Sequence, residues 1–225
     1  MTHPHFPLNS EISTLRVTEI FYSIQGESTY AGQPCVFVRL TGCPLRCSWC
    51  DTTYAFHGGK DMSLESVLKQ VNSYACPLVE VTGGEPLAQP AAFPFITKLC
   101  DEKFEVLVET SGSIDITSVD SRAQIIMDIK CPGSEMEDQI HWGNLQHITA
   151  KDQIKFVISN RGDYDWAVGI VKRHHLTDRC PVLFSPTFAS QDLRHMAEWI
   201  LQDRLSVRLQ VQLHKFIWGP EARGV

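Results

Sequence analysis

The stretch CVFVRLTGCPLRCSWCDT, residues 35–52, joins an apolar run to a loop that carries three cysteines. Residues 35–40 are apolar except for one arginine, which predicts a strand that is covered on both faces. Cys43, Cys47 and Cys50 follow it with the spacing Cys-x3-Cys-x2-Cys. In α/β folds, sites form on the loops at the carboxyl ends of strands. The stretch therefore predicts an α/β protein with a thiolate site at a strand end.

Three clustered thiols suit neither a disulfide framework nor a closed metal site. Disulfides use cysteines in pairs and are rare in a reducing cytosol. A structural zinc ion needs a fourth ligand, but the chain has no second C-x2-C pair and its nearest histidine is His57. An iron–sulfur cube held by three cysteines leaves one iron open to a small molecule, and a low-potential cluster donates electrons. We expect a [4Fe-4S] cluster here, with structural zinc as an alternative.

Short β-rich runs alternate with helical patterns along the chain, which predicts parallel βαβ units. The expected strands are residues 35–40, 78–82, 104–109, 124–130, 153–159 and 181–185. These are too few for a closed eight-stranded barrel of roughly 250 residues. The predicted fold class is α/β, a partial (incomplete) βα barrel with about six mainly parallel strands, in a single domain over residues 1–225.

Four helices are expected between these strands, because apolar side chains recur there with helical spacing. The residues expected to cap these helices or to mark a first turn are Ser63, Pro94, Asp163 and Ser190. Residues 206–214 alternate apolar and polar side chains instead. This alternation predicts a last strand with one face toward solvent or another chain.

Composition and charge exclude several classes of function. The 225 residues are 43% apolar and 20% charged, which is ordinary for a globular protein. The formal net charge is −6 and there is no basic block, so direct nucleic-acid binding is not expected. No segment approaches the roughly 18 apolar residues of a membrane span, and the first 14 residues lack the apolar core that a secretory signal has. We expect a cytoplasmic protein with no membrane partner. Its small buried core cysteines are expected to be Cys35, Cys76, Cys100 and Cys180.

The cysteine loop resembles the signature of the radical S-adenosylmethionine superfamily. The spacing matches, Trp49 provides the aromatic residue before the third cysteine, and the loop follows a strand. The resemblance implies that the open iron chelates the amino and carboxylate groups of S-adenosylmethionine. It also implies that an electron from the cluster cleaves the sulfonium bond and yields a 5′-deoxyadenosyl radical. A radical S-adenosylmethionine core is therefore expected.

Three further motifs end predicted strands, namely VTGGEP (81–86), ETSGS (109–113) and MDIKCP (127–132). Taken alone, the glycine pair is a turn into a proline-initiated helix, and Asp128 and Lys130 form a surface charge pair. Paired glycines also let a ligand approach the backbone closely. The resemblance favours this second interpretation, since the superfamily places its cofactor at these positions.

The segment SIQGES (23–28) and Arg39 indicate a substrate. An amide and a carboxylate can pair with the edge of a fused heterocycle, and a guanidinium can bind a carboxylate with two hydrogen bonds. Taken alone, Glu27 and Arg39 equally suit a surface ion pair. Residues 19–43 nevertheless resemble the 7-carboxy-7-deazaguanine synthases, and the resemblance continues through the later motifs to residues 212–220.

This resemblance implies a carbon–nitrogen lyase of queuosine and deazapurine biosynthesis. The substrate would be 6-carboxy-5,6,7,8-tetrahydropterin, which loses a hydrogen from C6 to the adenosyl radical. Ring contraction with loss of ammonia then gives 7-carboxy-7-deazaguanine. The implied cofactors are a [4Fe-4S] cluster, S-adenosylmethionine and Mg²⁺. The implied partners are an electron-donor protein, such as flavodoxin or ferredoxin, and a second copy of the chain in a homodimer.

The resemblance also assigns site residues by position. The cluster ligands are Cys43, Cys47 and Cys50, and the magnesium ligand is Thr52. The S-adenosylmethionine contacts are Trp49, Cys50, Asp51, Gly84, Ser111, Asp128, Ile129 and Lys130. The pterin contacts are Ile24, Gln25, Gly26, Glu27, Arg39, Thr82, His214 and Pro220. No protein acid or base is assigned, because the adenosyl radical abstracts the hydrogen.

Two alternatives differ in class from a synthase. A glycyl-radical activase shares the cysteine loop but acts on a protein and needs no pterin pocket. A zinc-binding interaction module would need no cofactor. The chain also departs from the synthase pattern at FSPTF (184–188), where relatives more often have a glutamine before the proline, and in a tail that continues past Pro220.

Overall fold

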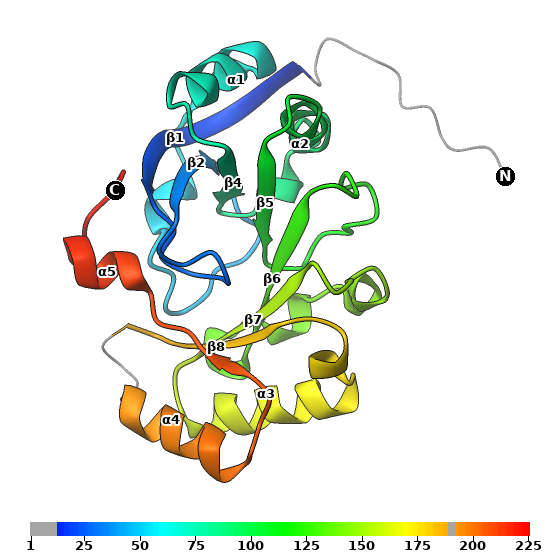
Figure 1. Cartoon of the computed structure of the whole chain (residues 1–225), viewed down its shortest axis with the longest axis vertical. Coiled ribbons are helices and arrows are strands. Elements are labelled where there is room, and N and C mark those ends of the chain that lie inside the picture. The colour runs from blue at the N-terminus through cyan, green and yellow to red at the C-terminus, as the bar shows by residue number, and fades with distance from the viewer. Residues whose placement is uncertain (1–12, 189–191) are drawn as a thin grey trace, which may run out of the picture.

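The computed structural model describes residues 13–188 and 192–225 (Figure 1). In these residues nine strands form one sheet with the order β3-β1-β2-β4-β5-β6-β7-β8-β9. The strands are β1 (Thr14–Ile24), β2 (Pro34–Leu40), β3 (Lys60–Ser63), β4 (Leu78–Gly83), β5 (Glu105–Thr110), β6 (Gln124–Lys130), β7 (Gln153–Ile158), β8 (Val182–Pro186) and β9 (Arg208–Leu209). The α-helices are α1 (Leu64–Ser73), α2 (Ala92–Asp101), α3 (Arg161–Arg173), α4 (Leu193–Gln202) and α5 (Leu213–Trp218). Short 3-10 turns lie between them at Thr53–Ala55, Pro86–Ala88, Pro132–Ser134, Glu137–Gln139, Trp142–Gln146 and Leu176–Asp178.

The sheet is an open, partial barrel, as predicted. Strand β2 and strands β4 to β9 pair in parallel, whereas β1 pairs antiparallel with β2 and β3. Strands β3 and β9 are the two edges of the sheet and do not pair with each other. The six expected strands are confirmed as β2, β4, β5, β6, β7 and β8.

Strands β1 and β3 are not among the expected elements. In β1 the buried side chains of Leu15 and Val17 alternate with the exposed Arg16. This alternation is the signal of a half-buried strand, and β1 needs it because only one of its faces meets the core. The antiparallel pair places the β1–β2 loop, residues 25–33, at the amino ends of the parallel strands. The Tyr30 hydroxyl accordingly donates to the Glu105 carboxylate at the start of β5, and the Thr29 backbone amide donates to the Gln153 side chain at the start of β7.

The helix starts are confirmed in part. Ser63 caps α1, since its Oγ accepts a hydrogen bond from the Ser66 amide at 3.2 Å. Pro94 lies in the first turn of α2. The cap expected at Asp163 is wrong. Asn160 caps α3 instead, and its Oδ1 accepts from the Asp163 amide at 3.0 Å. Both residue types cap helices well. The Asp163 carboxylate makes other bonds instead, since it accepts from the backbone amides of Gly133 and Ser159.

The fourth helix begins at Leu193, where the Asp192 side chain accepts from the Arg194 amide at 2.8 Å. The expected cap, Ser190, lies outside the described residues. The strand predicted over residues 206–214 is mostly wrong, because only Arg208–Leu209 pairs with β8 and α5 begins at Leu213. Of its polar side chains, Gln212 reaches the β1–β2 loop, where it donates a hydrogen bond to Glu27.

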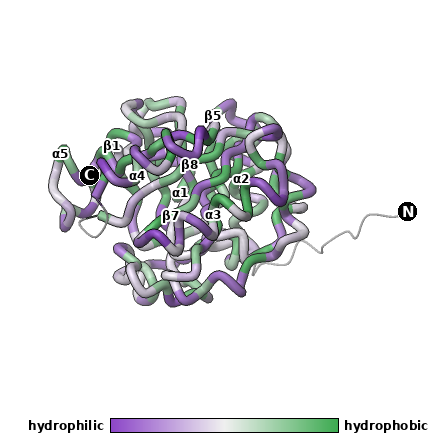
Figure 2. Tube along the Cα trace, turned by 90° about the horizontal axis from the view of Figure 1, so that it is seen from below, coloured by the Kyte–Doolittle hydropathy of each residue, from purple (hydrophilic) through white to green (hydrophobic). Residues whose placement is uncertain are grey.

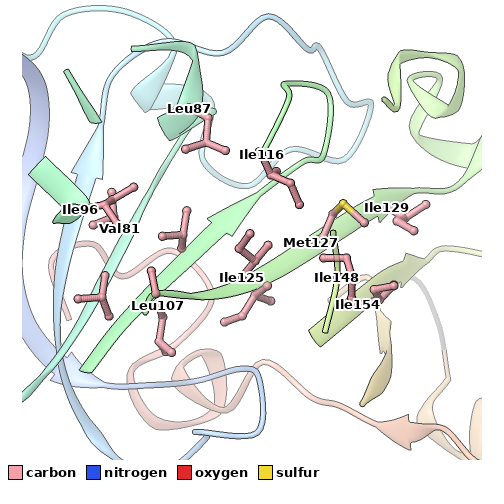
Figure 3. Close-up of a cluster of buried hydrophobic side chains, with 14 of the residues drawn as sticks. Val81, Leu87, Ile96, Leu107, Ile116, Ile125, Met127, Ile129, Ile148 and Ile154 are labelled. Carbon is pink, nitrogen blue, oxygen red and sulfur yellow. The ribbon is translucent and has the colours of Figure 1, made fainter. Parts of the chain in front are cut away.

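The core lies between the sheet and the helices on its outer face. Figure 3 shows part of this core, in which aliphatic side chains from β4, β5, β6, β7 and α2 pack together. Figure 2 shows that hydrophobic and hydrophilic residues alternate along much of the chain, as layered strands and helices require. The four cysteines expected in the core are buried, namely Cys35, Cys76, Cys100 and Cys180. Over the described ranges, no helix is long and apolar enough to cross a membrane.

Candidate functional site

A cavity of about 500 Å³ occupies the inner side of the open barrel. It is lined by strand ends, by the β1–β2 loop and by the C-terminal segment. The expected site residues that line it are Ile24, Gln25, Gly26, Glu27, Arg39, Cys43, Cys47, Trp49, Cys50, Asp51, Thr52, Thr82, Gly84, Ser111, Asp128, Lys130, His214 and Pro220. The exception is Ile129, whose side chain is fully buried in the core because alternate residues of β6 face opposite sides. Only the backbone of Ile129 can face the cavity.

Two regions of the cavity differ in construction. We call the cysteine loop and the carboxyl ends of β4, β5 and β6 the mouth of the cavity. We call Gln25, Glu27, Glu80, Glu109 and Lys155 the floor. The mouth is built from loops that follow strands, whereas the floor is built from the β1–β2 loop and from side chains inside strands.

Three partly exposed thiols line the mouth. Cys43, Cys47 and Cys50 have intermediate exposure, whereas the other five cysteines are buried. The loop is held by its neighbours, since the Ser48 amide and hydroxyl donate to carbonyls of the Pro132–Ser134 turn at 3.1 and 2.7 Å. Burial raises the pKa of all three thiols, and the Lys130 ammonium opposes this rise.

The thiols do not form a site for a single ion. Among the described residues, no group of three or more His, Cys, Asp or Glu side chains could hold one metal ion. A zinc ion needs its thiolates within about 2.3 Å. An iron–sulfur cube instead presents a separate iron to each cysteine, so it accepts more widely spaced thiolates. The residues at the mouth therefore fit a cluster better than they fit zinc.

Gly84 must be glycine because the cysteine loop passes directly against it. A Cβ at this position would lie 2.3 Å from the Gly42 carbonyl oxygen and 2.7 Å from the Cys43 Cβ. The next residue, Glu85, is fully buried. Its carboxylate accepts from the Thr110 hydroxyl at 2.8 Å and from the Ser111 amide at 2.7 Å. Glu85 thus ties the end of β4 to the end of β5, which aligns the loops around the cysteines.

The pair Asp128 and Lys130 is not the surface pair that the sequence alone allows. The two side chains are 10% and 17% exposed, and their Oδ2 and Nζ atoms are 2.9 Å apart. Burial alone would lower the pKa of Lys130, but the Asp128 carboxylate, together with Cys47 in its thiolate form, outweighs it and raises this pKa. Asp128 Oδ1 is buried and has no hydrogen-bond partner in the described residues. An unpaired buried oxygen in a cavity wall is suited to a ligand donor.

At the floor, the Gln25 side chain makes hydrogen bonds within the protein at both ends of its amide. Its amide nitrogen donates to the Glu80 carboxylate, and its Oε1 accepts from the Glu27 amide at 3.0 Å. Each end of the Gln25 amide thus makes one bond within the protein, and the second N–H and the second lone pair of Oε1 remain for a heterocycle, as expected from the sequence. Burial, reinforced by Glu109, raises the pKa of Glu80 well above its ordinary value, so this carboxyl readily holds a proton.

Glu27 faces Lys155 and not Arg39, so the ion pair considered from the sequence is absent. Glu27 Oε2 accepts from Lys155 Nζ at 2.7 Å, and Oε1 accepts from Gln212 at 2.9 Å. Burial alone would raise the pKa of Glu27, but Lys155 outweighs it and lowers this pKa to about 2. Glu27 is therefore a carboxylate at neutral pH.

Arg39 pairs with Glu19 instead. Its Nε donates to Glu19 Oε1 at 2.8 Å, and the same oxygen accepts from the Tyr54 hydroxyl at 2.8 Å. Only the Nε atom of the guanidinium takes part in this pairing, and Arg39 lines the cavity. Arg39 thus retains a two-donor edge suited to a carboxylate.

Thr52 lies beside Asp51 on the same wall. Its hydroxyl donates to Asp51 Oδ1 at 2.9 Å, while Asp51 Oδ2 accepts from Lys215 Nζ at 2.6 Å. Burial alone would raise the pKa of Asp51, but Lys215 lowers it below the ordinary range. Because its proton is directed to Asp51, the Thr52 oxygen has lone pairs available for a cation.

The C-terminal segment, residues 210–218, spans the open side of the barrel. The backbone amide of Gln210 donates to the carbonyl of Phe184 in β8. The backbone amide of Leu213 donates to the carbonyl of Gly26 in the β1–β2 loop, and both distances are 2.9 Å. Figure 1 shows α5 lying beside β1 and β2. A Cβ at Gly26 would lie 2.1 Å from His214 Nδ1, so this segment packs directly on the floor. Pro220 lines the cavity beyond α5.

Several cavity residues are not among the site residues assigned from the sequence. They include Phe21, Phe37, Glu80, Glu109, Lys155, Thr187, Phe188, Gln212 and Lys215. A charged residue inside an otherwise apolar strand is the signal that could have found three of them, in LVEVT, FEVLVE and QIKFVIS. Gln212 and Lys215 have no such signal, because they reach the cavity only where the C-terminal segment folds back onto the β1–β2 loop. Of FSPTF, Thr187 and Phe188 line the cavity, whereas Ser185 is buried.

Comparison with known proteins places the chain in context. Residues 37–132 match the model of the Radical SAM superfamily. The chain is 44% identical to a 7-carboxy-7-deazaguanine synthase of Chlorobaculum tepidum, over 94% of this chain and 97% of the relative. It is also 44% identical to a 7-carboxy-7-deazaguanine synthase of Koribacter versatilis, over 94% of this chain and 100% of the relative. The crystal structure of QueE from Escherichia coli has a TM-score of 0.74 at 21% identity, over 89% of this chain and 95% of that chain, and so has the same fold.

Proposed function

The chain belongs to the 7-carboxy-7-deazaguanine synthases of the radical S-adenosylmethionine superfamily, and from this premise we propose how its cavity performs that reaction. One observation carries the proposal: the three thiols and the buried acidic floor line a single cavity. A cofactor bound at the mouth would thus face a heterocycle bound at the floor. The alternative of a glycyl-radical activase is not favoured, since the curated relatives named above are synthases.

At the mouth, the residues bind and orient the cofactors. Cys43, Cys47 and Cys50 would hold a [4Fe-4S] cluster. When bound, the cluster and S-adenosylmethionine supply the hydrogen-abstracting radical. The unpaired Asp128 Oδ1 would accept a hydrogen bond from the cofactor, and the backbone at Gly84 would permit its close approach. Trp49, Asp51, Ser111 and Lys130 complete this end of the cavity.

At the floor, the residues bind and orient the pterin. Glu27 is charged and would accept from the N–H groups of the pyrimidine edge. Gln25 would act through its backbone, while its side chain fixes the Glu27 amide and Glu80. Thr82 and His214 lie at the sides, and burial lowers the pKa of His214, which keeps the imidazole neutral. The reaction class would be that of a carbon–nitrogen lyase, because ammonia leaves.

The substrate carboxylate would lie between Arg39 and Thr52. Arg39 offers two donors, and the Thr52 hydroxyl has lone pairs for Mg²⁺, which keeps several waters and gains ligands from substrate. Thr52 would help to hold the cation, which would supply positive charge beside the carboxylate that Arg39 binds. Pro220 and the residues that follow it cover this side of the cavity.

We further propose that the protein acts in the cytoplasm as a single-domain homodimer and receives its electron from a flavodoxin-like or ferredoxin-like donor. Its product would enter queuosine or deazapurine biosynthesis. These statements rest on the family and on the reducing conditions that a low-potential cluster needs.

The test is turnover by anaerobically reconstituted protein. With S-adenosylmethionine, a reductant, Mg²⁺ and 6-carboxy-5,6,7,8-tetrahydropterin, we expect one ammonia for each 7-carboxy-7-deazaguanine formed. Thr52→Ala should raise the Mg²⁺ concentration needed for half-maximal rate, on the order of tenfold, while the visible absorbance of the cluster stays unchanged. Absence of any deazapurine chromophore from the wild-type protein would refute the proposed function.

A further inference from the structure

Lys155 is a buried lysine surrounded by three carboxylates from three different elements. Its side chain is only 4% exposed, and its ammonium contacts Glu27 of the β1–β2 loop, Glu109 of β5 and Asp128 of β6. The Nζ atom lies 2.7 Å from Glu27 Oε2 and 3.5 Å from Asp128 Oδ2. The neighbouring carboxylates raise the pKa of Lys155 despite its burial, so the amine stays charged.

The Lys155 ammonium interacts mainly with these carboxylates. It donates hydrogen bonds to Glu27 and Glu109, and it lies at ion-pair distance, 3.5 Å, from Asp128 Oδ2. Lys155 therefore acts through these carboxylates and is a positioning residue. Without it, three like charges would share one water-poor cavity, where each would take up a proton or turn away.

The three carboxylates extend to opposite ends of the cavity. Glu27 lies at the floor and also bonds Gln212 of the C-terminal segment. Glu109, which also belongs to the floor, is 25% exposed and lines the cavity. Asp128 lies at the mouth, where it pairs with Lys130 next to Cys47. A single ammonium thus connects the region proposed for the pterin with the region proposed for S-adenosylmethionine.

We propose that Lys155 couples the binding of the two ligands, so that pterin at the floor strengthens the binding of S-adenosylmethionine at the mouth. This inference rests on the proposed function. N–H groups of the pterin compete with Lys155 for Glu27 and Glu109, which shifts the ammonium toward Asp128. Asp128 Oδ2 is then held more firmly, and Oδ1 is fixed toward the cofactor. By linkage, S-adenosylmethionine must strengthen pterin binding by the same factor.

The experiment measures equilibrium binding without turnover. Anaerobically reconstituted holoprotein, with no reductant, is titrated with S-adenosylmethionine in the presence and absence of 6-carboxy-5,6,7,8-tetrahydropterin. The ratio of the two dissociation constants is the coupling factor. We expect a factor of about 5 or more in the wild-type protein, within the usual range for coupled sites. Lys155→Met should bring the factor close to 1, whereas Lys69→Met, a change on the exposed face of α1, should leave it unchanged.

Retention of the wild-type coupling factor in Lys155→Met would overturn the inference, and so would a factor of 1 in the wild-type protein. Should Lys155→Met fail to fold, Lys155→Arg decides the question. Its larger planar group cannot reproduce all three contacts, so a reduced factor supports the inference and an unchanged factor overturns it. Normal synthesis of 7-carboxy-7-deazaguanine without coupling removes only this inference. A wild-type protein that neither binds nor converts the pterin removes the proposed function as well.

Discussion

The mouth and the floor of the cavity are made in different ways. The mouth consists of loops that follow β2, β4, β5 and β6, and its thiols are partly exposed. The floor consists of a loop that enters from the opposite end of the strands and of charged side chains inside β4, β5 and β7. The cysteine loop at the mouth could stay the same while the residues of the floor change, because the two regions are built from different residues. In the proposed function, the mouth therefore supplies the radical chemistry and the floor binds the substrate.

The largest effect is expected at the mouth. Cys47→Ala should abolish turnover and remove the visible absorbance of the cluster, because the remaining two thiolates cannot hold the cube. The measurement is iron content, absorbance and product formation after anaerobic reconstitution. Cys100→Ala, which changes a buried cysteine of α2, is the control and should retain all three. A Cys47→Ala protein with intact cluster absorbance would contradict the assignment of this thiol.

A floor substitution should spare the mouth. Glu27→Gln removes the charge that faces Lys155 and that we propose binds the heterocycle, and hydrogen bonds to charged groups contribute about 1.5–3 kcal/mol. We expect the KM for the pterin to rise about 10- to 100-fold, with cluster absorbance unchanged. Asp128→Asn at the mouth should instead weaken S-adenosylmethionine binding. The distinction between mouth and floor fails if Glu27→Gln weakens the cofactor but not the pterin.

A matched pair of glycines sharpens the comparison. A Cβ at Gly84 would meet the cysteine loop, whereas a Cβ at Gly26 would meet His214. Such crowding costs about 1–3 kcal/mol in a well-packed site, so we expect affinity losses on the order of tenfold. Gly84→Ala should raise the dissociation constant of S-adenosylmethionine, and Gly26→Ala that of the pterin. Equal losses of both ligands in both variants would show that the two regions do not act separately.

The mouth was largely predictable from the sequence and the floor was not. Cys43, Cys47 and Cys50 lie within one stretch of eight residues, so their spacing can be recognised without knowledge of the fold. Lys155 is 128 residues from Glu27, and only the β-sheet order brings the two together. Gln25 was expected at the site and lines it, but its side chain is bound to Glu80. That role depends on which strand faces the loop, and a local pattern contains no such information.

The smallest effect concerns two glutamates of the floor with opposite pKa shifts. The pKa of Glu27 is lowered to about 2, so its ionised form stabilises the fold above the ordinary pKa of 4.5, and this contribution is lost as pH falls toward 2. The pKa of Glu80 is raised. Its contribution is therefore present below pH 4.5 and is lost as pH rises through the folded-state pKa.

Glu80→Gln consequently tests whether the floor tolerates a neutral group at this position. The amide oxygen of glutamine can still accept from Gln25, and the variant no longer has to bury a charge. We expect it to unfold at neutral pH with a free energy equal to the wild-type value or about 1 kcal/mol higher, and to lose that advantage near pH 4.5. Glu27→Gln should be less stable than the wild-type protein at neutral pH, because Lys155 loses a partner. Denaturant unfolding at both pH values measures this difference. Destabilisation of Glu80→Gln at neutral pH would show that Glu80 is ionised and paired like Glu27.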